Sequence, residues 1–412
     1  MQETLSHYFG YKSFRPGQEE IITKILNHQH TLGVLPTGGG KSICYQVPGL
    51  MQGGTTIVIS PLISLMKDQV DQLQAMGIQA AYLNSSLTHK QQKEIEEQIK
   101  RGAIQFLYVA PERFENTFFL NLLRKIEIPL IAFDEAHCIS KWGHDFRPSY
   151  QSVIQKVFTL PQNFTIVALT ATATAEVQQD IMSKLSIGQN DVVKTSTKRR
   201  NLIFKVNPTY QRQKFVVDYV ANHEGQAGII YCSTRKQVEE LHEALNSEKI
   251  KSTIYHAGLT NKERIEAQND FLYDRVEVVI ATNAFGMGID KSNVRYVIHY
   301  NMPGDLESYY QEAGRAGRDG LKSECILLFS ERDKGLHEYF ITVSQADDDY
   351  KDKMGEKLTK MIQYTKTKKC LEATIVHYFE PNENLEECNQ CSNCIQENKT
   401  YDMTREAKMI IS

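Results

Sequence analysis

Residues 133–150 of this chain combine side chains suited to metal–phosphate chemistry with flat aromatic side chains. Asp134 and Glu135 directly follow an apolar run, residues 129–133, that predicts a buried strand. We expect Asp134 to hold magnesium and Glu135 to orient or deprotonate an attacking water; a helix N-cap pair is the alternative. The chain's only tryptophan, Trp142, follows closely. This proximity predicts that nucleotide hydrolysis is mechanically coupled to the binding of a nucleic acid strand.

A glycine-rich segment, residues 35–42 with the sequence LPTGGGKS, lies between a strand pattern and a helical pattern. Lys41 is expected to reach the β- and γ-phosphates, and Ser42 to ligate magnesium together with Asp134. Leu35 stands where the usual pattern begins with glycine, and the alternative is a glycine-rich turn with a surface lysine. The residues predicted to surround the phosphates are Thr37, Gly38, Gly39, Gly40, Lys41 and Ser42.

The second half of the chain carries a basic motif, residues 311–320 with the sequence QEAGRAGRDG. Arg315 and Arg318 are three residues apart and therefore share one face of a predicted helix. Arg318 is suited to neutralise charge on a phosphoryl group in transfer, acting from a domain that faces the phosphate loop. The alternative is a solvated basic helix end.

Three further residues have two interpretations each. Gln18 precedes the phosphate loop, and its side-chain amide offers a donor and an acceptor that match adenine N6 and N7. Tyr11 could stack on the base, although core or capping roles suit both residues equally well. His137 either couples the phosphate site to neighbouring segments or is a structural histidine.

Composition places the chain among ordinary globular proteins with reduced thiols. Its 412 residues are enough for two or three domains, and a formal net charge of −3 means that any nucleic-acid surface must be a local patch. No apolar run approaches the ~20 residues needed to span a bilayer, so we expect no membrane partner. The N-terminus lacks the pattern of a secretory signal, and we expect a cytoplasmic protein.

Four of the eight cysteines cluster near the C-terminus, where three of them are spaced C-x-x-C-x-x-C. In a cytoplasmic protein such a cluster favours a metal over disulfides. Four thiolates form a closed tetrahedral shell that fits structural zinc, with an iron–sulfur cluster as the alternative. The predicted ligands are Cys370, Cys388, Cys391 and Cys394.

The elements that must position these residues alternate between short β-rich runs and helical patterns. This alternation predicts an α/β fold built from βαβ units around mostly parallel sheets, in two domains joined by the polar stretch 194–201. Beyond about residue 345 the strand pattern ends and a helical pattern begins. Strands are predicted at 30–35, 55–59, 105–109, 130–133 and 165–169, then at 228–231, 252–255, 277–281, 296–300 and 325–328.

Taken together, these segments resemble a RecQ-family DNA helicase of superfamily 2. The resemblance rests on FGYKSFRPGQ, LPTGGGKS, SPLISLMKDQV, DEAHCISKWGHDFRP, LTATAT, ATNAFGMGIDK, QEAGRAGRDG and the four cysteines. It implies two RecA-like domains, at 1–206 and 207–344, and a small helical zinc-binding module at 345–401. Residues 402–412 resemble the start of a winged-helix domain.

The resemblance also implies roles for individual residues. Tyr11, Arg15 and Gln18 would contact adenine. The ATP site would be completed by Gln311, Arg315 and Arg318, with Gly288 and Asp290 lining the cleft. A loop formed by Trp142, His144, Phe146 and Arg147 would sense single-stranded DNA, and Thr170 would contact DNA and relay between it and ATP. An alternative for Trp142 and Phe146 is that both fill the interface between domains.

Polar residues that follow predicted strands of the second domain suit phosphate contacts. Small hydroxyls and free backbone N–H groups at such positions hold a nucleic acid backbone without reading its sequence. The basic run 198–200 could touch the same backbone, but a solvated linker between the domains is the favoured interpretation. The residues predicted to contact DNA here are Ser233, Arg235, His256 and Thr282.

We therefore expect an ATP-dependent 3′–5′ DNA helicase that uses ATP, Mg²⁺ and Zn²⁺ and serves DNA repair and recombination. It would bind single-stranded and forked DNA, as a monomer. One alternative is an ATP-gated clamp or remodelling module that does not separate strands. A second alternative is a superfamily 2 motor that acts on RNA.

Overall fold

The structure is a computed structural model that describes residues 1–85, 87–286, 291–383 and 386–395. Two predicted cleft residues, Gly288 and Asp290, lie outside the described residues. The segment 402–412, predicted to begin a winged-helix domain, also lies outside them.

Seven parallel strands among the described residues form the first sheet, in the order β3-β4-β2-β5-β6-β1-β7. Most of these strands are short apolar runs buried along their whole length, because helices cover both faces of the sheet. The strands are β1 (Thr31–Val34), β2 (Thr56–Ile59), β3 (Ala80–Leu83), β4 (Phe106–Val109), β5 (Leu130–Phe133), β6 (Thr165–Thr170) and β7 (Val192–Lys194).

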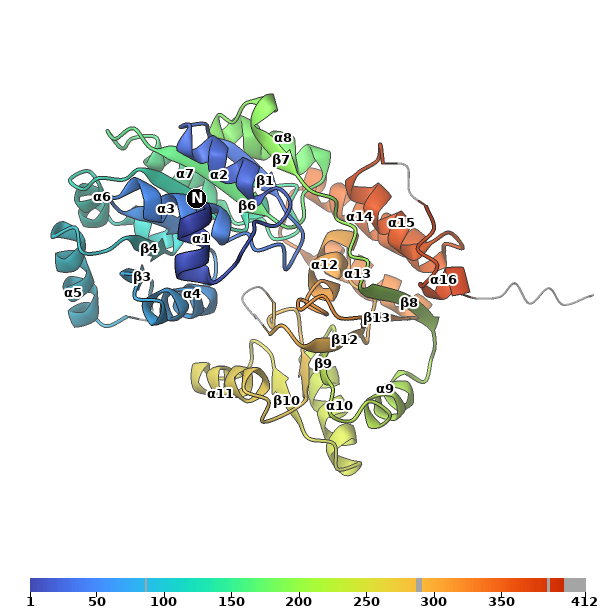
Figure 1. Ribbon diagram of the computed structural model, residues 1–412. Helices are drawn as coiled ribbons and strands as arrows, with labels where there is room; N and C mark the ends of the chain where they lie inside the picture. The colour runs from blue at the N-terminus through green and yellow to red at the C-terminus, as the bar shows by residue number, and fades with distance from the viewer. Residues whose placement is uncertain (86, 287–290, 384–385, 396–412) are drawn as a thin grey trace, which may run out of the picture.

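Two separate apolar clusters hold helices against the two faces of this sheet. One face packs α2, α3 and α4, and the other packs α5 to α8 (Figure 1). Short α1 joins α3 through a small cluster around Leu5 and Val47. The helices are α1 (Gln2–Phe9), α2 (Gln18–Leu26), α3 (Ile43–Gln52), α4 (Ile63–Ala75), α5 (His89–Lys100), α6 (Thr117–Leu123), α7 (Pro148–Val157) and α8 (Ala175–Leu185).

The second sheet contains six parallel strands among the described residues, in the order β10-β11-β9-β12-β13-β8. They are β8 (Leu202–Pro208), β9 (Ala227–Tyr231), β10 (Ser252–Tyr255), β11 (Val278–Ala281), β12 (Val294–His299) and β13 (Ser323–Phe329). The helices that pack with them are α9 (Arg212–Ala221), α10 (Arg235–Ser247), α11 (Asn261–Leu272), α12 (Leu306–Ala313) and α13 (Glu331–Val343).

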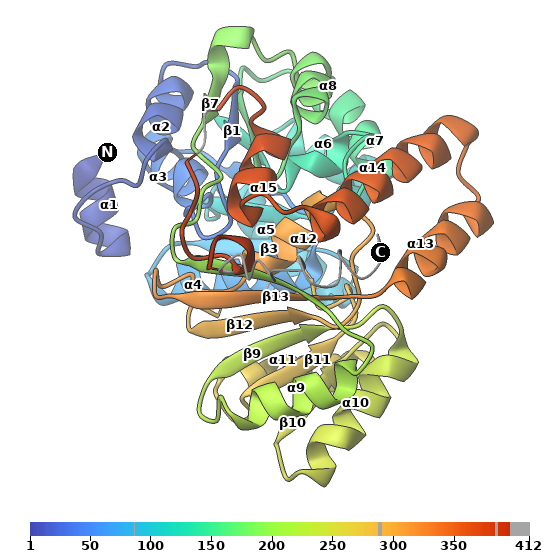
Figure 2. The same cartoon turned by 90° about the vertical axis from the view of Figure 1, so that its right-hand side faces the viewer.

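The C-terminal part is helical and packs against both domains. It contains α14 (Asp348–Lys366), α15 (Leu371–Phe379) and the short α16 (Ser392–Ile395). Cys370, Cys391 and Tyr364 belong to the same apolar cluster as the second sheet. In both views the red α14 and α15 lie alongside the two domains (Figure 2). An ion pair of 2.8 Å from Lys353 on α14 to Glu176 on α8 ties this part to the first domain.

The structure confirms the predicted α/β class and every predicted strand, with ends that differ by two residues at most. Three strands were missed. β3 contains two alanines, which have low strand propensity, β7 has only three residues, and β8 is an edge strand with a mixed burial pattern. The predicted domain boundary after residue 206 falls inside β8, which pairs along its whole length with β13. Among the described residues, no helix combines the length and apolar character needed to cross a bilayer.

Candidate active site

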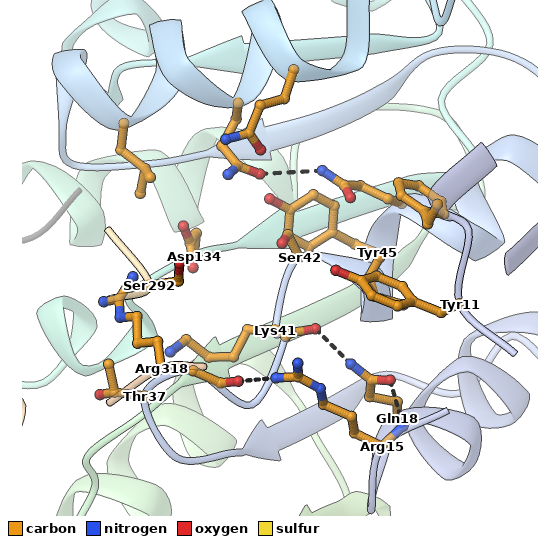
Figure 3. A pocket seen from close by; sticks show the side chains of 18 of the residues that line it. Tyr11, Arg15, Gln18, Thr37, Lys41, Ser42, Tyr45, Asp134, Ser292 and Arg318 are labelled. Carbon is orange, nitrogen blue, oxygen red and sulfur yellow. Dashed lines mark hydrogen bonds between the residues drawn. The ribbon is translucent and has the colours of Figure 1, made fainter. Parts of the chain in front are cut away.

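A cavity of about 410 Å³ lies between the two domains and collects the predicted nucleotide-binding residues. The first domain contributes the phosphate loop and the two carboxylates, and the second contributes Gln311, Arg315 and Arg318. Figure 3 shows Arg318 extending toward Lys41 and Asp134 across the cavity. The volume falls in the range usual for small-molecule sites. Lining residues that the sequence did not suggest include Phe9, Tyr45, Gln46 and Gln69.

The phosphate loop runs from the end of β1 to the start of α3, as its pattern predicted. Gly38 and Gly40 have φ values of 80° and 72°, a left-handed conformation that side chains disfavour. A Cβ at Gly40 would also lie 2.6 Å from the side chain of Gln18. Lys41 and Ser42 line the cavity just before the N-terminus of α3, where backbone N–H groups favour anions.

Gln18 and Arg15 hold the phosphate loop itself in this structure. The side-chain nitrogen of Gln18 donates to the carbonyl oxygens of Gly39 at 3.1 Å and Gly40 at 2.9 Å. Its side-chain oxygen accepts from the backbone N–H of Arg15 at 2.8 Å, and the Arg15 guanidinium donates to the Gly38 carbonyl. Both amide donors of Gln18 are therefore occupied, so an adenine contact would require the loop to rearrange. Tyr11 is half exposed and faces the cavity beside Tyr45.

Asp134 and Glu135 lie at the end of β5 and line the same cavity. Burial, followed by the charge of Glu135, raises the pKa of Asp134 to about 7, although Lys41 opposes the shift. A cation beside these two carboxylates would favour their ionised forms, which fits Mg²⁺ held by Asp134 and Ser42. Glu135 has a φ of 48°, a strained conformation for a residue with a side chain.

His137 connects Glu135 with Thr170. Its Nδ1 lies 3.1 Å from the Thr170 hydroxyl oxygen and 3.3 Å from a carboxylate oxygen of Glu135. The Thr170 hydroxyl donates to the Thr172 carbonyl, so Nδ1 carries the proton and donates. Burial, followed by the nearby positive charges, lowers the pKa of His137 well below its usual value. The ring is therefore neutral, and its contact with Glu135 is not an ion pair.

Thr170 itself does not reach the surface. It is fully buried at the end of β6, although the sequence placed it among the DNA-contacting residues. Its contacts suit a relay between His137 and the Thr172 segment, not a direct contact with a nucleic acid.

His144 joins the two domains. Its ring stacks on that of His137 with 4.1 Å between centroids, and its Nε2 lies 3.1 Å from the side-chain oxygen of Gln311 on α12. Gln311 lines the nucleotide cavity. A residue of the predicted DNA-sensing loop therefore contacts both the first-domain carboxylate site and the second-domain part of the cavity.

Trp142 lies in the contact between the first domain and α14. Its indole lies beside Lys141 and Lys353, whose Nζ atoms are 5.4 Å and 5.9 Å from the ring centroid. Its backbone carbonyl accepts a hydrogen bond of 2.8 Å from Lys357, which also forms a buried ion pair of 3.0 Å with Glu307. Sequence reasoning missed Lys357 and Glu307, because neither belongs to a recognisable motif.

Arg147 is occupied by contacts within the first domain. It donates to one carboxylate oxygen of Asp145 from two nitrogens, at 3.1 Å and 3.0 Å, and to the Pro61 carbonyl at 2.9 Å. These bonds shape the loop and engage all three guanidinium nitrogens of Arg147. Phe146 is half buried in the same loop.

The polar residues predicted to contact DNA from the second domain lie at one edge of its sheet. Ser233, His256 and Thr282 follow the carboxyl ends of β9, β10 and β11, which are neighbours in the sheet. Arg235 is exposed at the start of α10, whereas His256 and Thr282 are largely buried. The fold therefore brings these four residues together, with Ser233 and Arg235 the more accessible pair.

The basic run 198–200 is not the solvated linker that was the favoured interpretation. Arg200 is exposed, but Arg199 is half buried and donates to backbone carbonyls of both domains. The reason is tertiary: the linker passes directly over the junction between the phosphate loop and residues 314–317.

The four clustered cysteines bring their sulfur atoms within 4.8 Å of one another. A zinc ion with Zn–S distances of about 2.3 Å separates its ligands by about 3.8 Å, and three of the sulfur pairs lie at 3.4, 3.9 and 4.0 Å. Backbone N–H groups of Leu371 and Cys388 point at the sulfurs of Cys391 and Cys370. This donor set fits one zinc ion better than a multinuclear iron–sulfur cluster, which would need wider spacing.

Comparisons with known proteins agree with this geometry. Residues 15–181 match the family described as DEAD/DEAH box helicase, residues 211–320 the helicase conserved C-terminal domain, and residues 331–395 the RecQ zinc-binding family. The chain is 48% identical over its full length to the ATP-dependent DNA helicase RecQ of Bacillus subtilis, covering 69% of that protein. It is 42% identical over 99% of its length to that of Haemophilus influenzae, covering 65%.

The chain thus spans about two thirds of the length of these curated relatives. A solved structure of the DEAD-box helicase Mss116 bound to ssRNA superposes with a TM-score of 0.68 over 92% of this chain and 89% of that one, at 14% identity. At that identity the likeness concerns the fold alone, which consists of two RecA-like domains.

Proposed function

The chain belongs to the RecQ family of ATP-dependent DNA helicases, and we propose that it couples ATP hydrolysis to 3′-to-5′ movement on single-stranded DNA and to strand separation. The observation that supports this most is the shared cavity. Lys41, Asp134 and Glu135 reach it from one domain, and Arg315 and Arg318 reach it from the other. Because the site is divided between two domains, a change in the bound nucleotide would change the position of one domain relative to the other.

Each group has a role in hydrolysis that its position supports. Lys41 and the loop glycines would bind the phosphates, and Asp134 and Ser42 would hold the Mg²⁺ that neutralises charge on them. Glu135 would orient the attacking water. Arg318 would stabilise charge on the transferring phosphoryl group, a contribution of ~10³–10⁵ in rate in related chemistry.

DNA would communicate with this site through His144. Trp142, His144 and Phe146 would contact single-stranded DNA, and Ser233, Arg235, His256 and Thr282 would hold its backbone from the second domain. Stacking on an aromatic side chain returns ~1–3 kcal/mol per base, which is comparable with the ~1.4 kcal/mol of a base-pair step. DNA that engaged Trp142 would compete with its present contacts to Lys353.

Zinc would have a structural role. The four cysteines offer no open coordination position, so the ion would hold α15 and α16 against the second domain without entering the chemistry. Such a site requires reduced thiols, which fits a cytoplasmic location. The resemblance to the family carries the further proposal that the protein serves DNA repair and recombination.

One experiment separates this proposal from its alternatives. ATP turnover is measured with increasing single-stranded DNA or RNA, and strand separation is measured on duplexes with a 3′ or a 5′ tail. A 3′–5′ DNA helicase is stimulated more by DNA and separates only the 3′-tailed duplex. Stimulation of ATP turnover by DNA without strand separation would indicate a clamp. Equal or greater stimulation of turnover by RNA would indicate an RNA motor. Turnover indifferent to both would contradict the proposal.

A further inference from the structure

Arg199 occupies an unusual position between the two domains. It lies in the linker that follows β7 and precedes β8. One guanidinium nitrogen donates to the Thr37 carbonyl at 2.7 Å and the Gly314 carbonyl at 3.4 Å. The other donates to the carbonyls of Ala316 at 3.1 Å and Gly317 at 2.9 Å.

The remaining donor of Arg199, Nε, binds the side-chain oxygen of Asn201 at 3.3 Å. All five N–H donors of a guanidinium are therefore used, and each goes to a neutral oxygen. Such a pattern is specific to arginine, because only a planar fork can reach several carbonyls in different directions at once. A lysine at this position would present its donors from a single point.

The two segments that Arg199 joins are the phosphate loop and the loop that carries Arg315 and Arg318. These segments are in direct contact: a Cβ at Gly314 would lie 3.1 Å from Thr37 Cβ, and one at Gly38 would lie 3.5 Å from Arg318 Cγ. Figure 3 shows Thr37 and Arg318 side by side at the edge of the cavity. The carbonyls bound by Arg199 thus belong to residues adjacent to both halves of the ATP site.

The zinc-binding module holds the linker on its other side. The carboxylate of Glu380, just after α15, accepts from the Thr197 backbone N–H at 2.7 Å. Gln390, which lies between the zinc ligands Cys388 and Cys391 in sequence, donates to the carbonyls of Arg200 at 2.9 Å and Leu202 at 3.2 Å. The backbone that carries Arg199 is therefore held by two residues of the zinc-binding module, each of which lies between two of the clustered cysteines in sequence.

We propose that Arg199 is a positioning residue for ATP hydrolysis, which sets the place of Arg318 relative to the phosphate loop, and that the zinc-binding module keeps Arg199 in that place. The proposal rests on the proposed function, because it assumes that hydrolysis occurs in this cavity. Arg199 contacts only protein carbonyls, so its loss leaves the nucleotide-binding groups intact. A displacement of about 1 Å at a catalytic group can cost ~10²-fold in rate.

The test compares Arg199→Ala, Arg199→Lys and the matched control Arg200→Ala in the whole chain. Without DNA, we expect Arg199→Ala to lower kcat by about 10- to 100-fold, Arg199→Lys to be intermediate, and Arg200→Ala to match the parent. Affinity for ADP with beryllium fluoride, a ground-state mimic, should change little. Affinity for ADP with aluminium fluoride, a transition-state mimic, should fall with kcat.

Equal losses for the two mimics, or a kcat for Arg199→Ala equal to that of Arg200→Ala, would overturn the positioning role. If Arg199→Ala does not fold, as judged by its thermal transition, the same comparison is decided with Arg199→Lys. A parent chain whose ATP turnover is not stimulated by DNA would contradict the proposed function. The comparison of the Arg199 variants with Arg200→Ala would stay valid, because it is made without DNA.

The link to the zinc-binding module is tested with Gln390→Ala, with Gln363→Ala on the exposed face of α14 as its control. We expect Gln390→Ala to lower kcat by about 5-fold, the equivalent of one hydrogen bond, at unchanged zinc content. Combined with Arg199→Ala it should cause no further loss, because both act through the same contact. If the losses in kcat from Gln390→Ala and Arg199→Ala multiply in the double variant, the link to the zinc-binding module is overturned. The positioning role of Arg199 would remain.

Discussion

The Nε2 atom of His144 lies 3.1 Å from the side-chain oxygen of Gln311, across the boundary between the two domains. His144 also stacks on His137, whose Nδ1 lies 3.3 Å from Glu135. Three contacts thus connect the predicted DNA-sensing loop with the candidate water-orienting carboxylate and with the second domain. A shift of the loop on binding DNA would change all three contacts together.

His144→Ala should uncouple hydrolysis from DNA. It removes the contact with Gln311 and the stack on His137, but leaves the phosphate loop and both carboxylates in place. We expect DNA stimulation of ATP turnover to fall by about 5-fold or more, with basal turnover much less affected. Steady-state turnover with and without single-stranded DNA measures this. The control is His89→Ala, an exposed histidine on α5; equal losses with and without DNA would argue against coupling through His144.

Lys41→Ala should abolish hydrolysis while leaving DNA binding measurable. The lysine lines the cavity and is the cation of the first domain best placed for the phosphates. Turnover should fall toward the uncatalysed level, and fluorescence anisotropy with a labelled single strand should still show binding. Lys90→Ala, on the exposed face of α5, serves as the control. Hydrolysis near the parent rate would reject the assignment of the phosphate site.

Lys357→Met should destabilise the contact between Trp142 and α14. The ion pair with Glu307 is buried, with side-chain exposures of 5% and 3%, so removal of the lysine leaves a buried carboxylate unpaired. Loss of one partner of such a pair costs about 3–5 kcal/mol. Urea unfolding should show a decrease of this order, and Lys357→Met/Glu307→Gln should recover part of it. A double variant no more stable than the single one would show that the charge of Glu307 is not the cause.

The stability of the Lys357→Met variant should depend on pH in a defined direction. Burial raises the pKa of Glu307, with Asp305 adding to the effect and Lys357 opposing it. Without Lys357 the raised pKa rises further, so the folded state holds a proton that the unfolded state releases. Stability is then full below the unfolded pKa and decreases as pH rises through the folded pKa. The midpoint temperature of thermal unfolding should decrease between about pH 5 and about pH 8, and this decrease should be larger for Lys357→Met than for Lys357→Met/Glu307→Gln.

Cys391→Ser should release the zinc-binding module while nucleotide binding persists. The buried Cys391 thiol lies within 4.0 Å of the sulfurs of Cys370 and Cys394. We expect zinc content to fall from one ion per chain and cleavage by a protease to begin within residues 345–395, while affinity for a ground-state ATP analogue is retained. Because Gln390 binds the linker, kcat should fall as well. Unchanged resistance to proteolysis in this region would contradict the structural role of zinc.

Contiguous motifs were the features most readily predicted from the sequence. The phosphate loop, the carboxylate pair after β5 and the cysteine cluster each occupy a few successive residues, and their chemistry depends on backbone and side chains that are neighbours in the chain. The strands were equally readable, because a strand buried on both faces is a short apolar run. β3, with its two alanines, and the less buried β7 and β8 have weaker patterns and were missed.

The partners of isolated polar residues were decided only by the tertiary structure. Arg199 belongs to a run of three cations that looks the same whether it faces solvent or binds carbonyls more than 100 residues away. Gln18 has the amide that adenine would require, yet it binds the phosphate loop here.

From its sequence alone, this protein is recognisable as an ATP-binding motor with a zinc-binding module, because those sites are encoded locally. How the module reaches the ATP site was decided by the packing of the linker between two domains. A hydrogen bond acts over about 3 Å, and only the folded chain brings Thr37, Arg199 and Gly317 within that distance.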